Sequence, residues 1–165
     1  MNKICAFFGN DYDLIYGRTR RRCPNLSLKE KIKEQIINLI NNENVTKFLV
    51  GEIGGFETDA YDAVLEVQKS FPQIKIILVI SQITELNEIN RIAPDLIREK
   101  RGFDEFILPD KCATGYKKLG IVYRNRYIIE HTDFIIAYNR WHGKAYDFCK
   151  QAESKRVKVI ELAKE

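Results

Sequence analysis

The chain has 165 residues, of which 45% are apolar and 30% charged, and its formal net charge is +4. This composition is that of a globular domain with a sizeable core, and no apolar run approaches the ~20 residues that would span a bilayer. The N-terminus lacks the charged region, long apolar core and cleavage site of a signal peptide, so we expect a cytoplasmic protein without a membrane partner.

Apolar periodicity predicts strands and helices that alternate along the chain. In chain order these are a strand at residues 3–9, a helix at 27–42, a strand at 47–51, a helix at 57–70, a strand at 74–80, a helical segment at 85–100, a strand at 104–108, a helix at 116–131, a strand at 133–138, a helix at 144–156 and a strand at 158–162. Ser27, with Glu30 three residues later, is a suitable N-cap for the first helix. The alternation predicts a Rossmann-like α/β sandwich with a mainly parallel sheet, in one domain over residues 1–165.

Three of the turns that follow predicted strands carry unusual residues. In open parallel sheets, ligands bind beyond the carboxyl ends of the strands, where the strand order reverses. We therefore take these turns as candidate ligand-binding segments: Gly9 and Asn10; Gly51, Glu52, Gly54 and Gly55; and Asn139, Trp141, His142, Gly143 and Lys144.

Glycines between a strand and a helix let a ligand approach the backbone and expose the first amides of the helix, which suit a phosphate. The alternative is that the glycines only make the turn tight. The pattern is neither a P-loop nor a GxGxxG fingerprint, so the glycines alone do not decide between these interpretations.

Charged residues around these turns add to the phosphate interpretation. Arg124, Asn125 and Arg126 lie in the helix before the fifth strand, and arginine forks bind phosphates well. An acidic group, Glu52, Glu57 and Asp59, flanks the glycine pair. One of these carboxylates would bind a ribose or attack its anomeric carbon, or Glu57 and Asp59 would only stabilise the first turn of the helix.

Trp141 and His142 are the aromatic residues of the third turn. Trp141 is a candidate for stacking on a base, with packing over the sheet edge as the alternative. His142 is a candidate proton carrier or base contact, with an exposed turn histidine as the alternative. The four cysteines are widely spaced and no histidine stands at ligand spacing, so we expect no metal site and no disulfide framework.

Several segments resemble the YpsA-like branch of the SLOG superfamily, whose Rossmann-like domains are related to DprA and the LOG phosphoribohydrolases. These segments are ICAFFG at residues 4–9, FLVGEIGGFETDAY at 48–61, FDEFILPD at 103–110, and the stretch from RNRYIIEHTDFIIAY to the end of KVIEL at 124–162. The resemblance implies a nucleotide or nucleotide-derived ligand of the NAD or ADP-ribose type. The positions that match the family's motifs are Gly9, Gly54, Gly55, Arg124, Asn125, Arg126 and Gly143, and Glu57 stands where relatives often carry an acidic residue.

The sequence also departs from the resemblance. Asn10 and Asp11 stand where relatives have histidine and arginine, and Lys144 replaces the second glycine of the last turn. The PGGxGTxxE motif of the LOG enzymes is absent, so their activity is not carried over.

We therefore expect a module that binds a small-molecule nucleotide as sensor, carrier or sequestering protein and requires no cofactor. The alternative is a nucleotide N-glycosidase with Glu57 or Glu52 as nucleophile. A weaker alternative is DNA binding through residues 18–22, four of which are arginines; the 23 acidic residues argue against nucleic acid. Because relatives often associate, a homo-oligomer remains open.

Overall fold

A computed structural model describes residues 2–9, 26–51, 55–81 and 102–163 of the chain. Within this part, one sheet of six strands has the order β4-β3-β2-β1-β5-β6, and every neighbouring pair is parallel. The strands are β1 (Lys3–Gly9), β2 (Val45–Val50), β3 (Lys75–Val79), β4 (Glu105–Ile107), β5 (Phe134–Tyr138) and β6 (Lys158–Glu161). The helices are α2 (Leu26–Glu43), α3 (Gly55–Ser70), α6 (Asp110–Thr114), the 3-10 helix η1 (Lys117–Leu119), α7 (Gly120–His131) and α8 (Lys144–Ser154).

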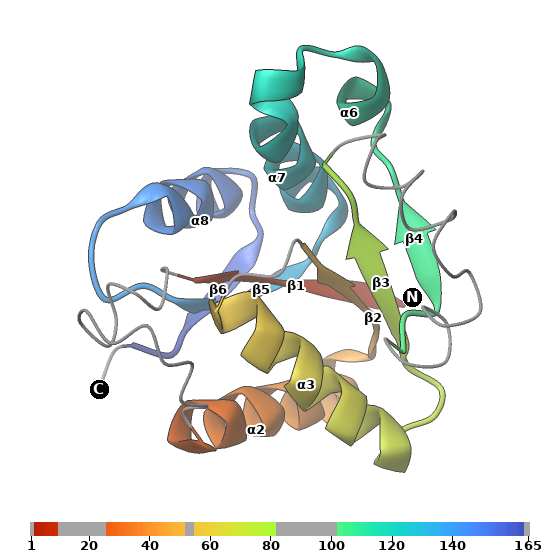
Figure 1. The fold of residues 1–165 in the computed structure, drawn as a ribbon. Helices are drawn as coiled ribbons and strands as arrows, with labels where there is room; N and C mark the ends of the chain where they lie inside the picture. The colour runs from red at the N-terminus through yellow and green to blue at the C-terminus, as the bar shows by residue number, and fades with distance from the viewer. Residues whose placement is uncertain (1, 10–25, 52–54, 82–101, 164–165) are drawn as a thin grey trace.

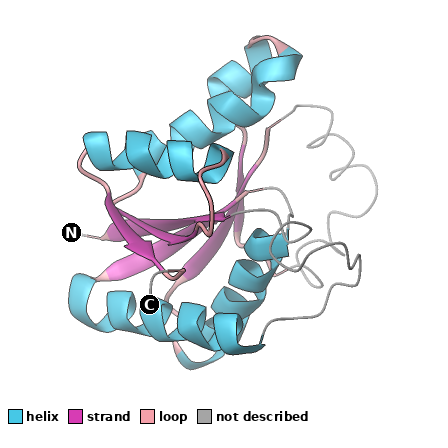
Figure 2. Cartoon of the chain, turned by 90° about the vertical axis from the view of Figure 1, so that its left-hand side faces the viewer, coloured by secondary structure: helices cyan, strands magenta, loops and turns pink. Residues whose placement is uncertain are grey.

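Helices cover both faces of the sheet, which confirms the predicted three-layer Rossmann-like sandwich. Figures 1 and 2 show α2 and α3 on one face and α7 and α8 on the other. Each face has its own apolar core, and the strands supply both cores by alternation. On β3, for example, Ile76 and Leu78 belong to the core under α2 and α3, whereas Ile77 and Val79 belong to the core under α7 and α8.

The strand order reverses at β1. The chain runs from β1 through β2 and β3 to β4 on one side, and then returns to place β5 and β6 on the other side. Gly9 at the end of β1 pairs with Tyr138 at the end of β5. The switch point of the sheet therefore lies between the first and the third of the turns that were selected from the sequence.

The predicted element boundaries differ from the structure at two places. A single helix at residues 116–131 is wrong: α6 and η1 precede α7, which begins only at Gly120. Gly115 is the extended C-cap residue that separates α6 from η1, and a Cβ there would lie 2.4 Å from the Lys111 carbonyl oxygen. Ser27 lies inside α2, which begins at Leu26, so it is not the N-cap. The predicted helical segment at 85–100 lies outside the described residues.

No helix in the described part of the chain combines the length and apolar character that crossing a bilayer would need.

Candidate functional site

The first turn of α3 packs directly on the end of β1. Phe56 is fully buried, and its ring leaves no space at Gly9: a Cβ on Gly9 would lie 2.4 Å from the Phe56 Cγ and Cδ1 atoms. The Phe56 ring also stacks on Tyr138, with 6.3 Å between the ring centroids. Gly9 is therefore a glycine because of this close approach, which brings the N-terminus of α3 to the switch point between β1 and β5.

A buried arginine reaches the same edge of the sheet from the opposite face. Arg124 of α7 lies against Gly51, just beyond β2, with its guanidinium carbon 3.0 Å from the position that a Cβ on Gly51 would take. Its Nε and Nη2 atoms donate to the Asn125 Oδ1 atom at 3.3 and 3.2 Å. Arg124 and Asn125 are both buried, and burying a guanidinium is costly unless polar partners surround it. The structure thus fixes a positive charge beside the second of the candidate turns.

The turn after β5 is held in place by the last strand. The Asn139 backbone N–H donates to the Glu161 Oε2 atom at 2.9 Å, and the Ala163 N–H donates to the same oxygen at 3.2 Å. The Asn139 Nδ2 atom donates to the Cys149 Sγ atom at 3.4 Å. Among the described residues, the Asn139 Oδ1 atom is buried and has no hydrogen-bond partner. The turn therefore presents a side chain with an unused acceptor.

The remaining residues of this turn lead into α8. Trp141 is half-buried and packs against the core under α2 and α3. His142 is exposed and stacks on Tyr146, with 4.0 Å between the ring centroids. Gly143 is the N-cap of α8, and the exposed Lys144 is its first residue.

We call the edge formed by Gly9, Gly51, the N-terminus of α3 at Gly55, Arg124, and the turn at residues 139–143 the rim. The structure brings these parts of the candidate site together at or beside the switch point. Asn10, Glu52, Gly54 and residues 18–22 lie outside the described residues.

Arg126 is not brought together with Arg124. Residues two apart on a helix point in very different directions. Arg124 faces Gly51 and is buried, whereas Arg126 is exposed and lines a groove against the segment after β4. The sequence motif therefore divides: Arg124 and Asn125 turn toward the sheet, and Arg126 turns away from it.

The predicted acidic residues differ in accessibility. Glu57 is half-buried in the first turn of α3, and Asp59 is 3% exposed. Both take part in polar or electrostatic interactions within the protein. The position of Glu57 is the one that a helix dipole favours for a carboxylate, which agrees with its alternative, stabilising role.

Two cysteines near the sheet are held as thiols. Burial raises the pKa of Cys149 to about 11, although the hydrogen bond from Asn139 opposes the shift. Burial raises the pKa of Cys5 far above its usual range. Neither supplies a thiolate nucleophile near neutral pH. In the part of the chain that the structure describes, no group of three or more His, Cys, Asp or Glu residues is arranged to hold a metal ion.

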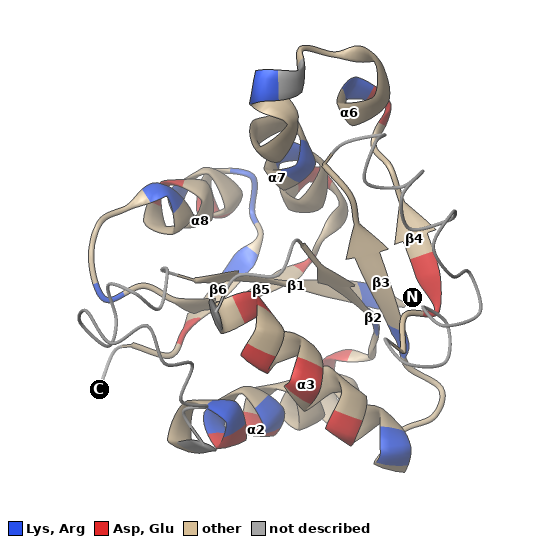
Figure 3. Ribbon diagram, viewed as in Figure 1, with Lys and Arg blue, Asp and Glu red and all other residues tan. Residues whose placement is uncertain are grey.

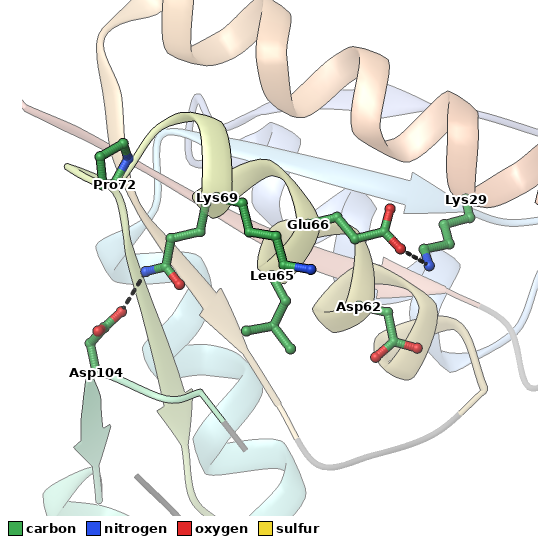
Figure 4. A pocket seen from close by; sticks show the side chains of 8 residues that line it. Lys29, Asp62, Leu65, Glu66, Lys69, Pro72 and Asp104 are labelled. Atoms are coloured by element: carbon green, nitrogen blue, oxygen red, sulfur yellow. Dashed lines mark hydrogen bonds and ion pairs between the residues drawn. The ribbon is translucent and has the colours of Figure 1, made fainter. Parts of the chain in front are cut away.

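A hollow with a volume of about 680 Å³ lies away from the rim, beside α3 (Figure 4). Four of its polar side chains have partners within the protein. Lys29 forms an ion pair with Glu66, and Asp104 accepts hydrogen bonds from the Gln68 side chain at 3.0 Å and the Ile76 N–H at 2.8 Å. These pairings connect the elements on either side of the hollow. We therefore interpret it as a space between packed elements and do not choose it as the candidate site on the basis of its volume.

A family model described as the YspA SLOG family, and named YpsA, matches residues 10–160. The chain belongs to the YspA SLOG family. Membership makes it a nucleotide-related Rossmann-like domain, in agreement with the parallel sheet and its rim. A comparison with curated proteins finds no match to this SLOG domain.

Two residues that support the rim were not singled out from the sequence. Phe56 directly follows the glycine pair, and its ring determines why position 9 is a glycine. Glu161 is the one acidic residue in the otherwise apolar run at residues 159–162 of this SLOG domain. β6 is half-buried, and a charged residue within an apolar strand of this kind favours a polar partner; that signal would have pointed to its hydrogen bonds with the turn after β5.

Proposed function

We propose that this domain binds a nucleotide or nucleotide-derived ligand of the NAD or ADP-ribose type at the rim. It acts as a sensor, carrier or sequestering protein and does not turn the ligand over. The observation that carries the proposal is the meeting of the N-terminus of α3, seated on Gly9, with the buried Arg124 beside Gly51. Helix N-termini and guanidinium groups are the protein groups that best stabilise a phosphate.

The remaining parts of the rim suit the rest of a nucleotide. The buried Asn139 Oδ1 atom has no partner among the described residues and would accept a hydrogen bond from a ribose hydroxyl or a base amine. Lys144 is exposed at the start of α8 and adds a flexible positive charge. Trp141 packs against the core, so we assign it to the support of the turn and not to base stacking.

A thermal-shift panel tests the proposal. ADP-ribose, NAD and AMP should raise the unfolding midpoint, whereas adenosine, which has no phosphate, should not. A ligand at 100 times its dissociation constant stabilises the native state by about 2.7 kcal/mol, which corresponds to a rise of roughly 5–10 °C for a chain of this size. A panel in which no phosphorylated compound moves the midpoint contradicts the proposal.

A matched pair of substitutions on α7 locates the site. Arg124→Lys keeps the charge but loses the planar fork, and we expect it to weaken ADP-ribose binding at least about tenfold. Arg126→Lys makes the same chemical change two residues away on an exposed side, and we expect unchanged affinity. Both affinities are measured by calorimetric titration below the unfolding midpoints, so that any loss of stability in Arg124→Lys does not enter the comparison. Equal effects of the two variants would remove Arg124 from the site.

Product analysis separates binding from catalysis. After incubation with NAD, ADP-ribose and nucleoside monophosphates, chromatography should find no released base. Base release that Glu57→Gln abolishes would show an N-glycosidase and would overturn the binding-only role.

A further inference from the structure

A second concave site lies on the other side of α7 from Arg124. It is a groove of about 440 Å³ between α7 and the segment that leads from β4 into α6. Ile107, Leu108 and Pro109 line one side of it, and Tyr123, Arg126 and Tyr127 line the other. We call this site the α7 groove. Its volume lies in the range of pockets that hold small organic ligands.

The sheet topology explains why a groove is present here. The described helices on this face are α6, α7 and α8, and α7 and α8 share one core with strands from the middle of the sheet. α7 carries the chain from the edge strand β4 to β5, beyond β1, so its buried side lies against the central strands. Its outer side, with Tyr123, Arg126 and Tyr127, faces the end of β4.

The aromatic residues and the arginine on this side of α7 form one recognition surface. Tyr123 and Tyr127 are four residues apart and therefore lie on the same side of the helix, with Arg126 next to them. His131 continues this surface, and its ring stacks on Tyr127 with 3.9 Å between centroids. Across the groove, Lys111 lies over the Tyr123 ring at 5.8 Å. The two tyrosine rings therefore lie opposite the apolar residues Ile107–Pro109, with the positive charges of Arg126 and Lys111 close by.

Arg126 is the available charge in this surface. Its side chain is exposed, and within the described residues it makes no hydrogen bond or ion pair. Two acidic residues also line the groove. Glu130 is paired with Lys155 at 3.5 Å, and burial, followed by the charge of Asp110, raises the pKa of Tyr127. The Tyr127 phenol therefore stays protonated and can donate a hydrogen bond.

We propose that the α7 groove is a second binding site, for a small organic anion with a planar ring. The ring lies between the tyrosine side and the Ile107–Pro109 side, and the anionic group pairs with Arg126. This site is distinct from the rim, since Arg124 and Arg126 point to different sides of α7, and its existence does not depend on the proposed nucleotide function.

An amide chemical-shift titration with phenyl phosphate tests this proposal on the full chain. We expect saturable shifts at Leu108, Lys111, Tyr123, Arg126 and Tyr127. Any phosphate contact at the rim would be seen separately, as shifts at Gly9 and Gly51. Benzyl alcohol supplies the ring without the charge, and inorganic phosphate supplies the charge without the ring. Each should bind at least about tenfold more weakly than phenyl phosphate.

Two variants make the result decisive. Arg126→Gln removes the charge from an exposed position, so the fold should persist while the phenyl phosphate shifts in the α7 groove are lost. Arg124→Lys alters the rim and should leave the shifts in the α7 groove unchanged. The absence of saturable shifts in the α7 groove, or shifts there that survive Arg126→Gln, would overturn the second site. Neither outcome bears on ADP-ribose binding at the rim.

Discussion

At Gly9, one added methyl group tests the packing that brings α3 to the rim. Gly9→Ala places a Cβ 2.4 Å from the Phe56 ring, which itself has no free space because it is fully buried. Overpacking of this kind destabilises a core by about 1–3 kcal/mol. We expect urea denaturation to show this loss relative to the unmodified protein.

A double-mutant cycle supplies the control for Gly9. Phe56→Leu removes the ring that the new methyl group would strike, so Gly9→Ala should cost less in the Phe56→Leu background. An equal cost in both backgrounds would show that the ring is not what excludes a side chain at position 9.

Glu161 offers a second test at the scale of a residue. Its Oε2 atom accepts from the Asn139 and Ala163 N–H groups, and Glu161→Leu leaves both donors without that partner. An unsatisfied buried donor costs about 1–3 kcal/mol, and because these two donors are only part-buried we expect a loss near the lower end of that range, with weaker ligand binding at the rim. Glu161→Gln retains a carbonyl oxygen and should recover most of both properties. The contrary result is a Glu161→Gln variant that is as stable as the unmodified protein but binds ADP-ribose as weakly as Glu161→Leu does. It would show that these hydrogen bonds do not position the turn for the ligand.

The residue scale is also where sequence reasoning was weakest. That a glycine ends β1 and another follows β2 is visible in the sequence, but the reason at Gly9 is the Phe56 ring and the reason at Gly51 is the Arg124 guanidinium. Both partners come from helices that pack onto the sheet, so their identity depends on tertiary geometry. The divergence of Arg124 and Arg126, by contrast, follows from helical periodicity and could have been read from their spacing.

At the scale of elements, α2 and α3 are joined by a small network of ion pairs. Lys29 and Lys33 of α2 both contact Glu66 of α3, and Figure 3 shows acidic residues recurring along α3 beside basic residues of α2. Hydrogen bonds from Lys29 and then Lys33 lower the pKa of Glu66 from its ordinary value of 4.5. A lowered carboxyl pKa stabilises the fold above the unfolded-state pKa, and this contribution is lost as the pH falls through the folded-state pKa.

Glu66→Gln measures that network. Because the pair lies near the surface, we expect a loss of about 0.3–1 kcal/mol at pH 7, seen by urea denaturation at low salt. The difference from the unmodified protein should shrink as the pH is lowered below the ordinary carboxyl pKa. Glu30→Gln is the control: among the described residues, Glu30 forms an ion pair with Lys33 of the same helix at 3.4 Å, so its loss should be smaller. A Glu66→Gln difference that persists unchanged in acid would exclude charge as its origin.

The predicted elements agree with the structure where apolar runs are long, and they fail where the helices are short. β3 lies within the predicted strand because its apolar residues serve both cores. α6 and η1 were missed because they have only five and three residues, too few for a helical period to show in the sequence. The break between the helices at Gly115 involves a close contact with the Lys111 carbonyl oxygen, which no pattern in the sequence predicts.

At the scale of the whole molecule, the alternation of strands and helices was enough to predict the parallel sheet, because parallel strands require crossovers that place helices on the faces. The same rule predicts that the turns after the strands meet at one edge. The strand order was not predictable in the same way. It depends on where α7 carries the chain after β4, and this crossing both creates the switch point at β1 and opens the α7 groove.

The most direct test of the central claim is an amide chemical-shift titration of the full chain with ADP-ribose. The nucleotide-binding account predicts saturable shifts at Gly9, Gly51, Phe56 and Asn139, with the Arg124→Lys variant showing them only at higher ligand concentration. Shifts confined to the α7 groove, or no saturable shift at the rim with ADP-ribose, NAD or AMP, would contradict it.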